Sequence, residues 1–124
     1  MKAIQLTAPA IDALTLSDVP CPQPGAGEVL IRQYAVSLNY LDLALATGGF
    51  GAISQTIIHG ADRAGEIVEL GGDVTGGQLG EGVVRGRKSS WQAGEIGAEE
   101  HEALPGGTHH GGMAGSGEVA GSQA

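Results

Sequence analysis

Large apolar side chains become scarce after Gly86, and this limits the fold more than any other feature of the chain. Roughly 85–90 residues remain that can build a hydrophobic core, which is enough for one domain at most. The 106–124 segment is rich in glycine, alanine, serine and histidine, and its sizeable apolar residues are Met113 and Val119. Two such side chains are too few to offset the entropy lost on ordering the segment. We therefore expect a small domain over residues 1–86 and a Gly-rich, disordered tail over residues 87–124.

The acidic charge balance argues against two classes of partner. With a formal net charge of −8, the chain repels phosphate backbones and anionic lipid, so we expect neither nucleic acid nor a membrane to bind. The N-terminal stretch is interrupted at Pro9 and Asp12, and no window approaches the roughly 20 apolar residues of a membrane-spanning helix. A single cysteine, Cys21, excludes an intrachain disulfide and fits a reducing compartment. These features predict a cytoplasmic protein.

Several segments carry the pattern of short β-strands. The clearest covers residues 29–38, where apolar and β-branched side chains follow one another without glycine or proline, so we expect it at the centre of a sheet. Glycine pairs at 71–72 and 76–77 are typical of tight turns between strands. The strands we predict cover residues 2–6, 14–19, 29–38 and 64–70. Short strands of this kind with one brief helix favour a mainly β fold, a small and irregular β-barrel.

The one predicted helix follows Asn39. Asparagine is a preferred N-cap residue, and Leu41 and Leu45 lie four residues apart, on one face of a helix. The glycines at 48–49 would end it. The spacing therefore predicts a helix of about two turns.

Two sequence blocks resemble a known enzyme family. The first reads GAGEVLIRQYAVSLNYLD over residues 25–42, and the second reads GADRAGEIVELGGDV over residues 60–74. Both resemble the N-terminal GroES-like domain of the medium-chain dehydrogenase/reductase superfamily, in its zinc-free quinone oxidoreductase branch, which is alcohol dehydrogenase-like. The resemblance covers about residues 1–84 and implies a partial GroES-like β-barrel. It also implies a Rossmann domain that holds NADPH in intact relatives and that we expect to be absent from this truncated chain.

The resemblance weakens after the second block. The family follows that block with a Gly-Asp-Arg-Val turn, whereas this chain has Gly80, Glu81, Gly82 and Val83. A loss of pattern inside a recognisable domain is what a frameshift or a gene remnant would produce. Translating the downstream DNA in the other two frames tests this hypothesis, because a frameshift predicts a strand, glycine loop and helix there.

Asn39 is the main candidate for the site. The resemblance implies that its amide lies near the nicotinamide and the substrate carbonyl, where it would donate a hydrogen bond. The alternative is a purely structural N-cap. The resemblance also makes the hydroxyl of Tyr40 a catalytic candidate, although a tyrosine between a strand and a helix more often packs against the core. For Asp42 we favour a structural role, since a carboxylate in the first turn complements the helix dipole.

No metal site is expected. Zinc-dependent relatives use a cysteine near position 38 or 39 and a histidine before the acidic residue of the second block, and Ala61 stands at that histidine position. His59 and Cys21 match neither position. We therefore expect no zinc.

The resemblance implies a function by ancestry. We interpret the chain as the substrate-side domain of an NAD(P)H-dependent oxidoreductase, which transfers hydride to or from a small quinone, enone, carbonyl or alcohol substrate. Without a Rossmann domain we expect this chain alone to be inactive and not to hold NADPH. Two alternatives stay open. One is a non-catalytic β-module that pairs with itself or another chain through an exposed sheet edge, and the other is a non-functional gene remnant.

Overall fold

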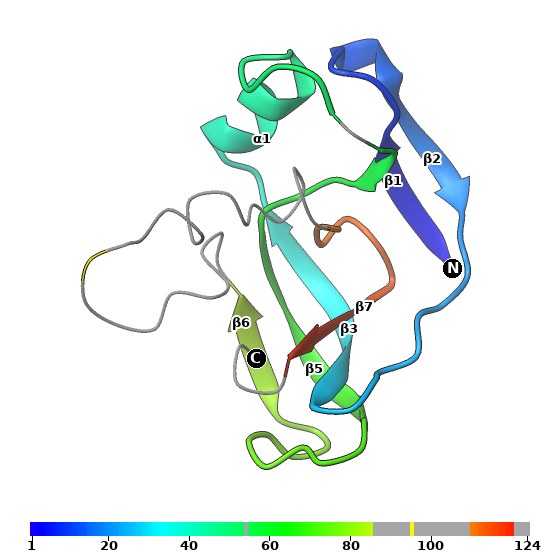
Figure 1. The fold of residues 1–124 in the computed structure, drawn as a ribbon, viewed down its shortest axis with the longest axis vertical. Coiled ribbons are helices and arrows are strands. Elements are labelled where there is room, and N and C mark those ends of the chain that lie inside the picture. The colour runs from blue at the N-terminus through cyan, green and yellow to red at the C-terminus, as the bar shows by residue number, and fades with distance from the viewer. Residues whose placement is uncertain (54, 86–94, 96–109, 121–124) are drawn as a thin grey trace.

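The computed structural model describes residues 1–53, 55–85, 95 and 110–120. They form two antiparallel sheets and one α-helix, as Figure 1 shows, which confirms the predicted mainly β fold with a single short helix. One sheet has the strand order β2-β1-β4 and the other has the order β6-β5-β3-β7. The elements are β1 (Lys2–Leu6), the 3-10 helix η1 (Ile11–Ala13), β2 (Leu14–Asp18), β3 (Glu28–Ser37), α1 (Tyr40–Ala46), β4 (Ile57–Ile58), β5 (Asp62–Leu70), β6 (Gly82–Arg85) and β7 (Ser116–Ala120).

The smaller sheet is built on the N-terminal hairpin. Strand β1 pairs with β2 over its whole length, from Lys2 opposite Asp18 to Leu6 opposite Leu14. Its other edge pairs with the two residues of β4. Leu6 is fully buried and packs with Ala46 of the helix and Ile57 of β4. The two predicted N-terminal strands are therefore confirmed, and they meet the helix through one apolar cluster.

Strands β3 and β5 form the longest ladder. Their pairing runs from Val29 opposite Leu70 to Ser37 opposite Asp62, with two irregularities in register. Alternate residues of β5 are buried, which is the period expected of a strand with one face toward the core. The buried cluster on this ladder is Val29, Ile31 and Ile67. As predicted, β3 lies in the interior of its sheet.

Helix α1 begins where the sequence predicts. Asn39 occupies the N-cap position with an extended backbone, and the helix ends at Ala46. Leu41 and Leu45 are buried and pack against Ala61, so the helix rests on the loop before β5. The one α-helix among the described residues has 7 residues, which is too short to span a membrane.

The altered turn at residues 80–83 does not abolish the next strand. Gly80 has a φ of 83°, and its N–H donates to Ile67 O over 2.8 Å. Glu81 O in turn accepts from Ile67 N over 2.9 Å. The chain thereby enters β6, which pairs with β5 along Arg63–Glu66. In this chain a glycine with a positive φ and backbone hydrogen bonds form the turn, without the Asp and Arg that the resemblance led us to expect.

Residues 110–120 differ from the disordered tail expected there. They form a loop and strand β7, which pairs antiparallel with β3 from Ser116 opposite Arg32 to Ala120 opposite Glu28. The expectation was wrong for this part because it counted apolar side chains, whereas a sheet edge can hold a strand through its backbone N–H and C=O groups. The rest of the expected disorder, at 87–94, 96–109 and 121–124, lies outside the described residues.

Candidate functional site

The candidate site lies where β3 gives way to α1. Strand β3 ends at Ser37, and Asn39 then adopts φ −123° and ψ 163° before the helix starts. This extended N-cap conformation turns the chain out of the sheet, so that Asn39 is exposed at the junction.

Hydrogen bonds to two neighbouring segments fix the side chain of Asn39. Its Nδ2 donates to Asp62 Oδ2 over 2.9 Å and to Ser37 O over 3.2 Å. Its backbone N–H donates to Asp42 Oδ2 over 2.8 Å, which is the carboxylate half of a capping box. The start of β5 and the start of α1 therefore both hold Asn39.

Asp42 joins the helix to the loop before β5. The residue is only 4% exposed, and its Oδ1 accepts from Ala61 N over 2.9 Å. His59, 2% exposed, lies with Nε2 3.0 Å from the Asp42 carbonyl oxygen. Because the carbonyl can only accept, Nε2 is the protonated ring nitrogen in this contact. Asp42 thus does more than complement the helix dipole, since it ties the helix to the second family block.

A pocket of about 260 Å³ opens beside this network. Most of its wall is apolar, and its polar side chains are those of the network just described. Such a wall with a few converging polar groups is the usual form of a small-molecule site. The lining residues are Ile11, Leu14, Leu38, Asn39, Asp42, Leu43, Ala46, His59 and Met113.

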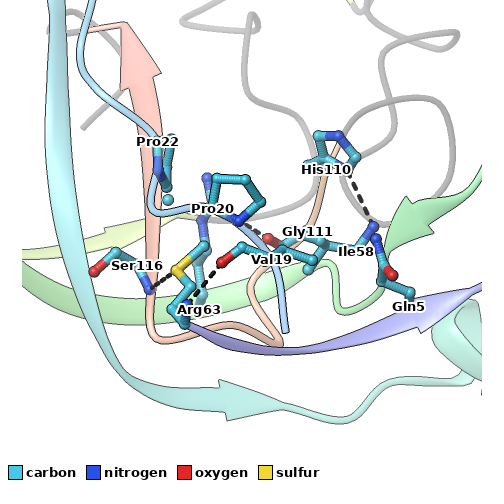
Figure 2. A pocket seen from close by; sticks show the side chains of 11 residues that line it. Gln5, Val19, Pro20, Pro22, Ile58, Arg63, His110, Gly111 and Ser116 are labelled. Carbon is cyan, nitrogen blue, oxygen red and sulfur yellow. Dashed lines mark hydrogen bonds between the residues drawn. The ribbon is translucent and has the colours of Figure 1, made fainter. Parts of the chain in front are cut away.

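A second pocket, of about 360 Å³, lies on a different part of the molecule, between the proline-rich crossing and residues 110–117 (Figure 2). Arg63 lines it, is 4% exposed, and donates from Nη1 to Gly111 O over 2.8 Å. His110 also lines it and accepts at Nδ1 from the N–H of Ile58 over 3.0 Å. Neither Asn39 nor Tyr40 lines this pocket, so it is separate from the candidate site.

Comparison with known proteins decides the family. The model of the alcohol dehydrogenase GroES-like domain matches residues 25–123, which is most of the chain and includes both β3 and β7. This chain belongs to the alcohol dehydrogenase GroES-like domain family.

The relatives of this GroES-like domain are oxidoreductases by name. This chain is 40% identical over 89 residues to the chloroplastic quinone-oxidoreductase QR1 of Triphysaria versicolor, and the match covers 68% of this chain and 27% of the relative. It is 41% identical over 86 residues to an L-threonine 3-dehydrogenase of Pyrococcus abyssi, covering 67% of this chain and 24% of the relative. A thermostable alcohol dehydrogenase from Pyrobaculum aerophilum superimposes with a TM-score of 0.82 and 28% identity, over 100% of this chain and 40% of that one. The GroES-like domain thus spans about a quarter of the curated relatives' length.

The structure separates the two residues predicted for the site. Asn39 lines the pocket and also serves as the N-cap, so the functional and structural interpretations of this residue are compatible. Tyr40 is 82% exposed, and it is not among the residues that line the pocket. The interpretation of Tyr40 as a wall of the core was wrong, because the first turn of α1 points this position into solvent while Leu41 faces inward.

Sequence reasoning missed three residues of this site in the GroES-like domain. His59 was considered only as a zinc ligand, Asp62 only as part of a motif, and Met113 only as part of the expected tail. The one sequence signal for His59 was an ionisable residue directly before the second family block, and its burial is seen in the structure alone. The pairing of β3 with β5 places Asp62 opposite Ser37. No local signal marked Met113, because its position depends on the path of residues 110–115.

The described part of the GroES-like domain contains no cluster of three or more histidine, cysteine, aspartate or glutamate side chains that could hold a metal ion. At the position of the zinc-binding histidine, Ala61 offers only a methyl group, and its N–H is bonded to Asp42. Cys21 is exposed on the proline-rich crossing. The expectation that this chain binds no zinc stays a prediction.

Proposed function

We propose that this chain is the substrate-side domain of an NAD(P)H-dependent oxidoreductase, with the pocket at Asn39 as the face that receives a small quinone, enone, carbonyl or alcohol. One observation carries the proposal. Asn39 and Asp42 line an apolar pocket, and hydrogen bonds hold Asn39 to Asp42 and to Asp62, in a domain whose relatives are oxidoreductases by name.

Each residue of the network has a distinct task in this proposal. Asn39 binds the polar group of the ligand, because it is the exposed member of the network. Asp42 and Asp62 are positioning residues, since their carboxylates accept from Asn39 and do not themselves have to touch the ligand. Leu38, Leu43 and Met113 exclude water from the ligand's apolar part. Tyr40 remains a catalytic candidate because it follows Asn39 in the chain and is widely exposed, although it does not line the pocket.

The cofactor fits the described residues only in part. NADPH would supply the hydride when bound, and a pocket of about 260 Å³ can receive a group as small as the nicotinamide. A dinucleotide also needs a glycine-rich turn that leads into a helix, where its pyrophosphate binds. Within the described residues the one α-helix is α1, which follows β3 through Leu38 and Asn39 without such a turn. We therefore expect this chain alone to bind NADPH weakly and to be inactive.

A two-dimensional amide NMR spectrum of the full chain tests the proposal. We expect dispersed peaks, and we expect those of Asn39, Leu43, His59 and Met113 to move when cyclohexanol is added at millimolar concentration. Asn39→Ala should weaken this response, whereas Gln23→Ala, which removes an exposed amide that does not line the pocket, should not. If cyclohexanol shifts only the peaks of residues outside the pocket, the ligand site is not at Asn39.

An NADPH oxidation assay with quinones provides the second measurement. We expect no turnover by the chain alone. If turnover does occur and Asn39→Ala leaves it unchanged, Asn39 is not part of the site.

A further inference from the structure

We propose that Asn39 offers its side-chain oxygen, and not its NH2 group, to a ligand, so that the pocket selects a neutral molecule with a hydrogen-bond donor. A hydroxyl or a primary carboxamide provides such a donor, whereas a carbonyl alone does not. The inference rests on the proposed function, because it names the chemistry of the ligand at that same site. It also reverses the role predicted from sequence, in which Asn39 donates to a carbonyl.

Both N–H bonds of the Asn39 side chain are engaged within the protein. An amide NH2 group carries two donor hydrogens. Asp62 Oδ2 lies 2.9 Å from Nδ2 and Ser37 O lies 3.2 Å from it, so the two hydrogens have two acceptors within the protein. A ligand would have to displace one of these bonds in order to receive a hydrogen bond from Asn39.

The chemistry of the two partners fixes the orientation of the amide. A backbone carbonyl and a carboxylate are acceptors only. If the amide of Asn39 were rotated by 180°, its oxygen would face Asp62 Oδ2 and Ser37 O, and three acceptors would meet without a donor. The hydrogen-bond network therefore assigns Nδ2 to the protein side and Oδ1 to the other side of the amide.

The oxygen keeps capacity for a ligand. It lies toward the N–H of Asp42 in the capping box, and that N–H also donates to the Asn39 carbonyl oxygen over 3.0 Å. A carbonyl oxygen accepts two hydrogen bonds, so at least one lone pair of Oδ1 stays open.

The surroundings are short of donors and not of acceptors. Asp42 already accepts from two backbone N–H groups. Asp62 Oδ1 is buried and has no hydrogen-bond partner among the described residues. A ligand that brings a donor adds what this neighbourhood lacks, whereas an anionic ligand would meet the two carboxylates. Together with the apolar wall, this favours a neutral, mostly apolar alcohol, or a nicotinamide through its carboxamide.

Two matched pairs of probes test the inference on the full chain. Cyclohexanol is compared with cyclohexanone, and nicotinamide is compared with N,N-dimethylnicotinamide, which has lost its donors. Kd is taken from the NMR shifts of Leu43 and His59. We expect the donor-bearing member to bind roughly fivefold more tightly, as one net hydrogen bond allows. The pair that shows this ratio identifies the donor as a substrate hydroxyl or as a carboxamide.

A substitution at Asp62 tests the cause of the selectivity. Asp62→Asn replaces an acceptor-only group with one that can also donate, and Ser37 O is then the one remaining partner that must accept. Both orientations of the Asn39 amide become possible, so the fivefold preference should fall to about twofold. Asp73→Asn makes the same change of charge at an exposed residue outside the pocket and should keep the preference. The dispersion of each spectrum shows that the variant is folded.

The outcomes separate this inference from the proposed function. If cyclohexanone and N,N-dimethylnicotinamide, the two probes without a donor, bind as tightly as their partners or more tightly, the inference is overturned and the pocket remains the site. No shift at the pocket with any of the four probes overturns both. A preference that is undiminished in Asp62→Asn overturns the assignment of the Asn39 orientation to Asp62. Because the probe pairs are compared on the unaltered chain, the test stands even if Asp62→Asn does not fold.

Discussion

Strands β5 and β7 flank β3 on opposite sides, and they are held there by different means. On one side, β5 pairs with nearly the whole length of β3, and Ile67 of β5 joins Val29 and Ile31 in the core. On the other side, β7 pairs with only the first half of β3, from Glu28 to Arg32. The β3–β5 contact buries a cluster of apolar side chains, and the β3–β7 contact is a shorter backbone ladder.

The loop before β7 shows how far backbone bonding extends. Gly111 N donates to Ile58 O over 2.7 Å, and Met113 O accepts from Ile4 N over 2.8 Å, so the loop bonds to β4 and β1 of the smaller sheet. Gly115 O accepts from Gln33 N of β3 over 3.0 Å. Residues 110–117 thereby link the two sheets. A segment poor in apolar side chains can hold a fixed path when neighbouring backbones supply its hydrogen bonds.

The largest effect is expected where side chains dominate. Ile67→Ala should lower the free energy of unfolding by about 3 kcal/mol, because the residue is 1% exposed and the cavity adds to the lost burial. Urea unfolding followed by far-UV circular dichroism measures the loss. Leu70→Ala on the same strand is the matched control, since that side chain is 39% exposed and should cost much less. Equal losses would mean that the two faces of β5 do not differ as the structure shows.

A glycine substitution should affect the other side of the comparison. Gly111→Ala should cost about 2 kcal/mol, because the new Cβ would overlap Gly60 O and lie 2.5 Å from His59 O, both backbone atoms. We expect amide exchange to quicken at Ile4 and Gln33, whose N–H groups donate to this loop. Gly72→Ala is the control, since its Cβ meets nothing within 4 Å and should change stability by less than about 0.5 kcal/mol. A large loss at Gly72 and none at Gly111 would contradict the proposed path of residues 110–117.

One side chain also anchors this loop. His110→Ala removes the acceptor of the Ile58 N–H. Because Ile58 is only 8% exposed, the free energy of unfolding should fall by about 1 kcal/mol. Hydrogen exchange of the Ile58 amide should quicken, while that of His59, which donates to Ile4 O over 2.9 Å, should stay slow. His110→Asn should restore part of the protection, because the asparagine oxygen is placed at the same distance along the side chain as Nδ1. Unchanged exchange at Ile58 in His110→Ala would exclude the anchor.

These contrasts explain which parts of the fold could be predicted from the sequence. Strands β1, β2, β3 and β5 and helix α1 each carry a local pattern of apolar residues or a cap, and each is found within two residues of its expected bounds. Strands β4, β6 and β7 were not predicted. The first has two residues, and the other two follow glycine-rich stretches, so their positions depend on hydrogen bonds to distant segments that no local pattern encodes.

The same division applies to the candidate site. Asn39 could be found because a family motif and an N-cap pattern coincide there. The direction of its amide could not, since it depends on Asp62, which lies 23 residues away in sequence and reaches Asn39 only through the β3–β5 ladder. A donor role is the natural expectation for an asparagine near a carbonyl. We infer an acceptor role instead because Nδ2 has two acceptors within the protein, Asp62 Oδ2 and Ser37 O.

The smallest predicted effect sharpens the account of the β3–β5 ladder. Tyr34 donates from its hydroxyl to Glu66 Oε2 over 2.6 Å across these strands, but the tyrosine is 63% exposed. Tyr34→Phe keeps the ring and removes only this bond, so the free energy of unfolding should fall by at most about 0.5 kcal/mol, because water competes for both partners. A double-mutant cycle with Glu66→Gln in urea isolates the pair. A coupling as large as the loss in Ile67→Ala would show that polar contacts on the solvent face, and not the buried apolar residues, hold β5 to β3.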